Sequence, residues 1–442
     1  MMWTALPVRR CWSKDCVSWG VSAHAEAALA ESLGLDLIIT DHHHPPERLP
    51  SACAVINPQQ PDCSFPDKEL AGVGVAFFLL IALRKALREA GCFAARPEPD
   101  LRLLLDLVAL GTIADMVPLT GVNRSLTRIG LQLLDQSSRP GINALKEVAG
   151  VERVSCGKVG FQLAPRLNAA GRLEDAALGV ELLLSDDFAA ALSTARLLDG
   201  LNRERQTLEK QALEQAIERL ERDPAPERRS IVLADERWHP GVIGIVASRL
   251  VERYHRPTVL IALADGLGKG SARSIRGFHL YEALDRCCQH LLGFGGHAYA
   301  AGLSLAAGSA DDFSAAFESA AAALTADDLI PQLLHDGEVL LQELDPATVT
   351  QLAGLQPFGM GNPEPVFVVN GVRTQQAAVV GNDHLRFTAR QDGYSLPCIA
   401  FGMAERLALL TGEMDLLCTP VLNPWKGRDE VQLRIKDMRP SI

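Results

Sequence analysis

The sequence predicts an α/β protein with a parallel-sheet domain, a second α/β domain and a C-terminal β-barrel. The apolar run Leu35–Ile39 follows a predicted helix and reads as a buried parallel strand. A second alternation of strands and helices begins at Ile231, and short alternating segments separated by turns begin at Val366. Residues 22–150 contain only one further clear strand, Ala54–Ile56. Because a parallel sheet needs several strands, we expect this first sheet to be incomplete at its N-terminal side.

The composition restricts the class of protein. With 442 residues, of which 48% are hydrophobic, the chain can form two or three domains with cores of their own. Its net charge of -11 argues against coating duplex DNA by bulk charge, although a local basic groove remains compatible. We expect no membrane contact, since there is no apolar run of about 18 residues. Ten cysteines without a CxxC spacing favour a reduced, cytoplasmic protein.

A carboxylate and three histidines directly follow the first predicted strand. They are residues Asp41–His44, and Pro45 and Pro46 then prevent further regular pairing. Ligands of open α/β sheets bind beyond the carboxyl ends of strands, where acid and imidazole groups suit a divalent metal ion. Adjacent histidines can share one site only if the backbone turns, which the prolines favour. The alternative is a polar loop whose histidines only form hydrogen bonds.

Helices dominate the rest of the first domain. We expect helices over Ala25–Leu33, from Leu70 through Leu87, and over Leu101–Leu110, the last broken at Gly111-Thr112. Asp115 then lies in an apolar turn, where a carboxylate is costly to bury unless it is paired or bound to a metal. We therefore interpret Asp115 as a further metal ligand; an N-cap or turn acid is the alternative.

Three later segments combine glycine with basic side chains or histidine. We expect Ala164–Arg172, Lys269–Ser274 and Gly293–Gly302 to form turns or loops. Guanidinium groups and backbone N–H groups in such loops could hold phosphate groups. Together the segments favour a groove that binds a phosphodiester backbone. Solvated surface arginines and tight strand-to-helix packing are the alternatives.

A long helix and a small barrel complete the predicted order. Periodic leucines and alternating charges from Leu178 to about Leu220 predict a long connecting helix, and Pro224–Pro226 marks a domain boundary. Pro331–Pro365 is expected to be a polar connection. The expected strands after it are Val366–Val369, Gln375–Val380, Leu385–Ala389, Ser395–Ala400, Asp415–Pro420 and Glu430–Ile435.

This strand pattern favours an OB-fold-like barrel, which binds single strands by stacking and by contacts to the charged backbone. Trp425, Lys426 and Arg428 lie on a candidate binding loop. A structural barrel without a ligand is the alternative.

Taken in order, the motifs resemble those of the RecJ family of DHH phosphoesterases, from about residue 20 to the C-terminus. The motifs are Asp41-His42-His43, Gly111–Asp115, Pro165–Arg172, Gly270–Ser274, and Gly295-Gly296-His297 followed by Ala300-Ala301-Gly302. The resemblance implies a single-strand-specific 5′-to-3′ DNA exonuclease of DNA repair and recombination. It also implies hydrolysis assisted by two Mn²⁺ or Mg²⁺ ions, and imidazole with carboxylate ligands suits such a site.

The resemblance implies four domain-level parts. They are a partial DHH phosphoesterase domain at residues 1–175, a connecting long helix at 176–223, a DHH-associated domain that grips nucleic acid at 224–330, and an OB-fold-like domain at 331–442.

It also implies roles for particular residues. The catalytic group comprises Asp41, His42, His43 and Asp115, in which the last three bind metal and Asp41 orients an imidazole. The residues implied to contact DNA are Arg166, Asn168, Arg172, Ser271, Arg273, Gly295, Gly296 and His297. Of these, Ser271 and Arg273 resemble residues that hold the terminal 5′-phosphate.

The sequence departs from the family pattern near its start. The family has an early aspartate-rich motif, roughly Asp-x-Asp-x-Asp-Gly, which is absent here. It then has Val-Asp-Asn-Gly or Val-Asp-Cys-Gly, where this chain has Val17–Gly20, with Ser18 in the place of a ligand aspartate. We therefore expect that the N-terminal part of the nuclease domain is missing. We also expect weak or no hydrolysis, because one ion without its partner loses most of the two-metal stabilisation.

Two other functions stay open. One is a non-catalytic single-stranded-DNA-binding protein, and the other is a DHH phosphodiesterase acting on small nucleotides, against which the barrel argues. For the exonuclease, the resemblance implies single-stranded DNA with a 5′ end as substrate, and a helicase and a single-strand-binding protein as partners. We expect a monomer in the cytoplasm.

Overall fold

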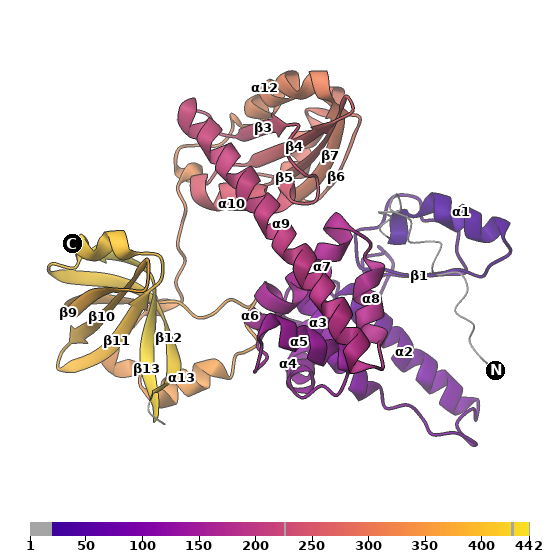
Figure 1. Cartoon of the computed structure of the whole chain (residues 1–442), viewed down its shortest axis with the longest axis horizontal. Coiled ribbons are helices and arrows are strands. Elements are labelled where there is room, and N and C mark those ends of the chain that lie inside the picture. The colour runs from indigo at the N-terminus through magenta and orange to yellow at the C-terminus, as the bar shows by residue number, and fades with distance from the viewer. Residues whose placement is uncertain (1–19, 225–226, 426–427, 442) are drawn as a thin grey trace. The chain divides into compact units, whose positions relative to one another are not determined.

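The computed structural model describes residues 20–224, 227–425 and 428–441. The described residues of Ser138–Glu152 and Phe161–Gln332 form one compact unit, called the first unit below. Those of Ser18–Ser137, Arg153–Gly160 and Leu333–Ile442 form another, called the second unit. Figure 1 labels many of the elements of both. None of the helices described is both long enough and apolar enough to cross a membrane.

The N-terminal part of the second unit contains a two-stranded parallel sheet. β1 (Ile38–Thr40) and β2 (Ala54–Ile56) pair in parallel with Ile39 opposite Val55, which confirms the two predicted strands. The expectation of a strand buried on both faces is wrong, because Ile39 is buried whereas Ile38 is 57% exposed. Alternate residues of a strand point to opposite faces, and only the face of Ile39 meets the core.

Helices form the rest of this part. They are η2 (Gly20–Ser22), α1 (His24–Ser32), α2 (Gly72–Glu89), η3 (Leu101–Leu104), α3 (Leu105–Ala114), α4 (Gly121–Asp135) and α6 (Cys156–Lys158). The predicted break at Gly111-Thr112 is wrong, because α3 continues to Ala114. Gly111 instead permits close packing, since a Cβ there would lie 2.9 Å from Cγ1 of Val73 on α2.

Four helices and one π-helical turn lead into the sheet of the first unit. They are α5 (Pro140–Ala149), η4 (Val159–Leu163), α7 (Ala164–Leu173), α8 (Ala177–Leu184) and α9 (Phe188–Arg222). The prediction of a loop over Ala164–Arg172 is wrong; Pro165 lies in the first turn of α7, directly after the π-helical turn η4. The helix expected from Leu178 is interrupted, and α9 starts where Asp187 accepts a hydrogen bond from the N–H of Ala190.

A five-stranded sheet forms the rest of the first unit, in the order β3-β4-β5-β7-β6. Its strands are β3 (Ile231–Asp235), β4 (Thr258–Ala264), β5 (Leu267–Arg273), β6 (Gly293–Gly296) and β7 (Ala300–Ala306), and its helices are α10 (Ile243–Tyr254), α11 (Leu280–Asp285) and α12 (Ala310–Ala321). β3 and β4 are parallel and the other pairs are antiparallel. In β4, Leu260 packs toward α9 and α10, whereas Val259 packs toward Phe313 and Phe317 of α12. Figure 1 shows α10 and α12 beside this sheet.

Two segments predicted as turns are strands. Lys269–Ser274 lies mainly in β5, and Gly293–Gly302 forms β6, a tight turn and the start of β7. A Cβ at Gly270 would lie 2.4 Å from Cδ1 of Leu303. This glycine therefore makes room for a large residue of the neighbouring strand, a packing requirement that single-sequence turn propensity does not reveal.

The C-terminal part of the second unit is a closed five-stranded barrel, which confirms the prediction. The strands β9 (Phe367–Val380), β10 (His384–Gln391), β11 (Tyr394–Ala400), β13 (Arg428–Pro440) and β12 (Glu413–Trp425) pair in this order, and β9 pairs with both β10 and β12. The short strand β8 (Gly337–Glu338) adds to β9. Leu385, Phe387 and Leu416 are among the residues that fill the core.

The segment before the barrel contains more structure than the expected polar connection. It includes η8 (Leu341–Glu343) and α13 (Pro346–Ala353), whose N-terminus is capped by Asp345. Within the barrel, η9 (Ala404–Leu409) follows β11. The predicted binding loop is not described in full, because Lys426 and the side chains of Trp425 and Arg428 lie outside the described residues.

Candidate functional site

The end of β1 brings acid and imidazole groups together. One ligand atom each of Asp41, His42 and His43 lies within 4.8 Å of the others. The backbone turns directly after Thr40, and the side-chain amide of Asn57, itself buried, donates to the carbonyl oxygen of His43 at 2.7 Å. This bond stabilises the turn that allows the side chains of the adjacent residues His42 and His43 to share one site.

Asp41 is surrounded by hydrogen-bond donors. Its Oδ1 accepts from the backbone N–H groups of His42 (2.7 Å) and His43 (3.1 Å) and lies 2.7 Å from the ring Nδ1 of His43. Its Oδ2 accepts from the N–H of Val21 at 2.8 Å. Burial alone would raise the pKa of Asp41, but these hydrogen bonds outweigh it and hold that pKa well below its ordinary value. The ionised carboxylate therefore accepts the Nδ1 proton of His43 and fixes the ring orientation.

His42 faces the end of α3. Its Nε2 lies 3.0 Å from Oδ2 of Asp115, the residue that ends this helix. The carboxyl group of Asp115 is 42% exposed, so the expectation of a buried acid is wrong. The rings of His42 and His43 are 4.3 Å apart between centroids. The hydrogen bond to Asp41 raises the pKa of His43.

The donor set fits a divalent cation. His42 lies beside His43 at the end of β1 and also contacts the accessible carboxylate of Asp115 at the end of α3, and imidazole with carboxylate ligands suits Mn²⁺. Asp41 differs from the other three, because both its oxygens already accept hydrogen bonds. This geometry suits Asp41 to orienting the ring of His43 rather than to binding a cation directly.

A second cluster lies in the first unit and contains two arginines. The Nη1 of Arg273 donates to Oγ of Ser271 at 3.1 Å, and the Nη1 of Arg172 donates to the carbonyl oxygen of Gly241 at 3.1 Å. Burial lowers the pKa of Arg273, and the charge of Arg172 lowers it further. A Cβ at Gly244 would lie 2.8 Å from Oγ of Ser271, so only glycine permits this close approach of α10 to Ser271. Two neighbouring cations that repel each other favour an anion between them.

Arg172 is exposed, but its guanidinium group lies near other charged side chains. The residue as a whole is exposed, yet burial of its guanidinium lowers its pKa. The positive charge of Arg205 lowers the pKa as well, and Glu209 opposes both effects. Because Arg172 is exposed, its side chain is accessible to a ligand.

The other predicted residues of α7 differ from each other. The Nε of Arg166 donates to Oδ1 of Asp199 at 2.9 Å, and its Nη1 donates to the carbonyl oxygen of Gln162. Part of its hydrogen-bonding capacity is therefore used inside the first unit. Asn168 is exposed on the same helix.

The glycine motif forms the hairpin of β6 and β7. Gly295 pairs with Gly302, and the N–H of His297 donates to the carbonyl oxygen of Ala300 at 2.8 Å. A Cβ at Gly295 would meet no atom within 4 Å, whereas Gly296 has a φ of +145° and its Cβ would lie 2.4 Å from the carbonyl oxygen of Ala300. Gly295 is thus an open backbone surface, and Gly296 is required by the turn.

Family models match three parts of the chain. The DHH family N-terminal domain matches residues 15–112, the DHHA1 domain matches residues 228–323, and the RecJ OB domain matches residues 335–437. The chain is 43% identical to the single-stranded-DNA-specific exonuclease RecJ of Dickeya dadantii (strain 3937), over 95% of this chain and 76% of that protein.

The chain belongs to the RecJ family.

It is also 40% identical to RecJ of Bacillus subtilis (strain 168), over 96% of this chain and 53% of that relative, so it spans about half of the relative's length. The solved structure of RecJ from Thermus thermophilus in complex with Mn²⁺ matches with a TM-score of 0.82 and 35% identity, over 96% of this chain and 61% of that one. Its complex with Mg²⁺ matches with a TM-score of 0.78.

The sequence interpretation missed a buried ion network beside Arg172. Glu209 on α9 accepts hydrogen bonds from Arg205 and from Arg249, and the side chains of Arg205 and Glu209 are 10% and 7% exposed. In the sequence, the alternating charges of this helix supported only the prediction of a long connecting helix. The i, i+4 spacing of Arg205 and Glu209 indicates an ion pair in the sequence, but this spacing does not distinguish a surface pair from a buried one.

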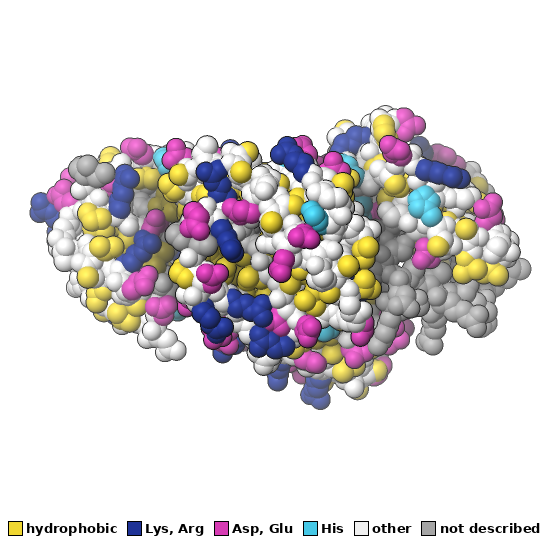
Figure 2. Space-filling view, turned by 90° about the horizontal axis from the view of Figure 1, so that it is seen from above, with side chains coloured by type: hydrophobic (Ala, Val, Ile, Leu, Met, Phe, Trp, Pro, Cys, Tyr) yellow, Lys and Arg dark blue, Asp and Glu magenta, His cyan; other side chains and the backbone are white. Residues whose placement is uncertain are grey.

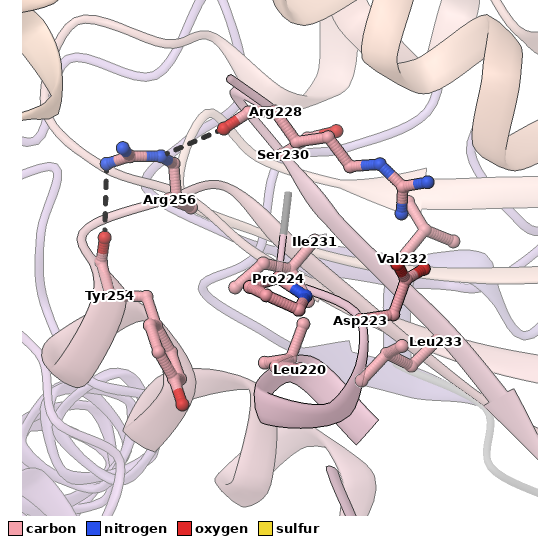
Figure 3. A pocket seen from close by; sticks show the side chains of 10 residues that line it. All are labelled: Leu220, Asp223, Pro224, Arg228, Ser230, Ile231, Val232, Leu233, Tyr254 and Arg256. Carbon is pink, nitrogen blue, oxygen red and sulfur yellow. Dashed lines mark hydrogen bonds between the residues drawn. The ribbon is translucent and has the colours of Figure 1, made fainter. Parts of the chain in front are cut away.

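The first unit also contains a cavity of about 280 Å³ (Figure 3). It is lined by Leu220, Asp223, Pro224, Arg228, Ser230, Ile231, Val232, Leu233, Tyr254 and Arg256. Arg256 donates to the carbonyl oxygens of Arg228 and Tyr254, so part of its guanidinium is used to hold the wall. None of the predicted site residues lines this cavity.

Proposed function

We propose that the chain is a single-stranded-DNA-specific exonuclease of the RecJ type, which hydrolyses phosphodiester bonds with the help of divalent metal ions. The observation that carries this proposal is the cluster of His42, His43 and Asp115 beside an ionised Asp41. Relatives named as single-stranded-DNA-specific exonucleases support it. The 5′-to-3′ direction rests on the family resemblance alone.

We propose His42, His43 and Asp115 as metal ligands, with Asp41 orienting the ring of His43. Bound Mn²⁺ or Mg²⁺ would supply Lewis-acid stabilisation of the transferred phosphoryl group and an activated water. The residues of the chain hold the ligand atoms in place. Asp41 fixes the tautomer of His43, and the bond from Asn57 keeps the turn closed.

Residues of the first unit would bind the substrate. We propose that Arg172, Ser271 and Arg273 hold the terminal 5′-phosphate, since two guanidinium groups and a hydroxyl form strong bonds to phosphate oxygens. The residues proposed to contact the rest of the strand are Arg166, Asn168, Gly295, Gly296 and His297. On the face drawn in Figure 2, Lys and Arg side chains are interspersed with Asp and Glu side chains, which favours local contacts over bulk attraction.

The family supports a wider setting for this activity. We propose single-stranded DNA with a 5′ end as the substrate and DNA repair and recombination as the process. We further propose that the chain acts in the cytoplasm as a monomer, with a helicase and a single-strand-binding protein as partners.

A non-catalytic DNA-binding function is the second candidate. One observation favours it: the sequence contains no Asp-x-Asp-x-Asp-Gly motif, which in the family resemblance supplies further metal ligands. We propose that the 442-residue chain hydrolyses DNA weakly by itself, because a site with fewer carboxylates binds a second ion poorly.

The deciding experiment uses the 442-residue chain with Mn²⁺ and single-stranded DNA labelled at the 5′ end. We expect slow release of labelled mononucleotides, none from His43→Ala, and far less from a duplex of the same sequence. Binding is measured in parallel with EDTA present. Binding without release from the wild-type chain would support the DNA-binding function, and release that His43→Ala does not abolish would refute the proposed ligand set.

A further inference from the structure

Asn123 is a buried residue whose side chain links two separate backbone segments of the second unit. It lies in the first turn of α4 and is 1% exposed. Its Nδ2 donates to the carbonyl oxygens of Glu69 (2.6 Å) and Pro118 (3.1 Å), and its Oδ1 accepts from the N–H of Ala71 at 3.2 Å. Both amide hydrogens and the amide oxygen are therefore used.

The first segment leads back to the candidate metal site through Asp115. Pro118 follows Asp115 by three residues, and Met116 between them has a φ of +58°. This left-handed backbone is rare for a residue with a side chain and must be held by its surroundings. The bond from Asn123 to Pro118 is one such restraint, and it restricts where Asp115 can lie.

The second segment leads to His42. Ala71 is the residue that precedes α2, and Gly72 begins the helix. A Cβ at Gly72 would lie 3.3 Å from Cδ2 of His42, so the backbone here forms the wall against which that ring packs. Moving the N-terminus of α2 would move the support of His42.

We propose that Asn123 is a positioning residue for the metal site: it joins the segment that carries Asp115 to the helix end that supports His42. By this link it keeps Nε2 of His42 and Oδ2 of Asp115, now 3.0 Å apart, within reach of one cation. The inference rests on the proposed function, because it assumes that these two side chains share an ion.

The test compares Asn123→Ala with two variants of the same helix. Thr127 is fully buried one turn further on, and its hydroxyl has no hydrogen-bond partner among the described residues, so Thr127→Val leaves the network intact. Leu134 is fully buried near the end of α4, so Leu134→Ala lowers stability without touching the network. Asn123→Asp keeps the size of the side chain and the acceptor for Ala71 in case Asn123→Ala does not fold.

The first readout is the Mn²⁺ dissociation constant, obtained without DNA from the free-ion signal in electron paramagnetic resonance. We expect Asn123→Ala to raise it roughly 10- to 100-fold, the range found when a partner of metal ligands is removed. Thr127→Val should stay within about twofold of the wild-type chain. Leu134→Ala should lower Tm at least as much as Asn123→Ala does but leave the Mn²⁺ affinity unchanged.

The second readout is hydrogen exchange in peptides that cover residues 69–72 and 115–119. Asn123→Ala should speed exchange in both peptides. Asn123→Asp should speed exchange mainly in the peptide 115–119, and Thr127→Val should change exchange in neither peptide. Wild-type Mn²⁺ affinity in Asn123→Ala, or an equal loss in Leu134→Ala, overturns the positioning role. A wild-type chain that binds Mn²⁺ but releases no nucleotide overturns the proposed activity alone, whereas one that binds no Mn²⁺ overturns both.

Discussion

The backbone N–H of Leu119 donates to the carbonyl oxygen of Met360 at 2.6 Å. This bond joins the segment after Asp115 to the connection that leads into the barrel. The guanidinium of Arg124 adds four bonds, to the three carbonyl oxygens of residues 354–356. We call residues 354–362 the clasp, since they close over the start of α4 within the second unit.

Removing Arg124 is expected to open the clasp. Arg124→Ala leaves several carbonyl groups without their cationic donor, a local loss of about 1.5 kcal/mol, at the low end for charged hydrogen bonds because the site is partly exposed. Hydrogen exchange should therefore rise by about tenfold in residues 354–362 and stay constant in β10 and β11. Arg128→Ala, on the exposed side of the same helix, is the control. Equal exchange in the two variants would show that Arg124 does not hold the clasp.

Asp41 is expected to stabilise its surroundings in a pH-dependent way. Its pKa in the folded chain lies below the ordinary value of about 3.9. Such a group contributes stability that is fully present above the ordinary value and is lost as the pH falls through the folded-state pKa. Asp41→Asn removes this contribution, which we place on the order of 1–3 kcal/mol, because an amide cannot accept all four hydrogen bonds.

The measurement is urea unfolding of the chain at several pH values. Pulse-labelling hydrogen exchange, always at one labelling pH, reports the unfolding of residues 20–43. The difference between Asp41→Asn and the wild-type chain should be largest between about pH 5 and pH 6. It should shrink below about pH 4, where Asp41 is protonated, and also above about pH 6.5, because the raised pKa of His43 contributes stability that is lost as this histidine deprotonates. A difference that grows as the pH falls below about 4 would contradict the assigned direction of the Asp41 pKa shift.

Arg273 is expected to recognise the terminal phosphate by geometry as well as charge. Its Nη1 already donates to Ser271, and a lysine has no planar group that could keep this bond and reach a phosphate. Arg273→Lys should therefore weaken binding of a 5′-phosphorylated oligonucleotide by roughly 10-fold or more, in line with about 1.5–3 kcal/mol for charged hydrogen bonds. Binding of the 5′-hydroxyl oligonucleotide should change little.

Fluorescence anisotropy in EDTA measures both affinities. Arg253→Lys is the matched control, because Arg253 lies on exposed α10 surface and pairs with Glu221. If Arg273→Lys weakens both oligonucleotides equally, Arg273 contacts the strand but not its phosphorylated end.

The neighbouring glycines of β6 are expected to differ. Gly296→Ala places a Cβ 2.4 Å from a carbonyl oxygen at a φ of +145°, so it should disrupt the hairpin and lower Tm by several degrees. Gly295→Ala meets no atom within 4 Å and should leave the fold unchanged. If the backbone of Gly295 contacts DNA, this variant weakens single-strand binding without loss of Tm. Thermal unfolding measures the effect on the fold, and fluorescence anisotropy measures the effect on single-strand binding. Equal Tm values for the two variants would contradict the steric argument.

The sequence by itself determined most of the element types, and it predicted the residues of the candidate site. Polar residues at the end of an apolar strand, as at Asp41–His44, indicate a site because strand ends gather ligands in α/β sheets. The alternation of apolar residues predicted the barrel strands, because one face of each strand must fill the core. These signals are local, and each can be read within one element.

Only the tertiary structure decided how the site is held. The link from Asn123 to Ala71 spans 52 positions and the one from Glu209 to Arg249 spans 40, so no local pattern contains them. Ala164–Arg172 and Lys269–Ser274 contain residues that favour turns, yet they form α7 and most of β5, because packing against neighbouring elements outweighs local propensity. Burial of polar side chains depends on which elements meet, and that is a property of the whole fold.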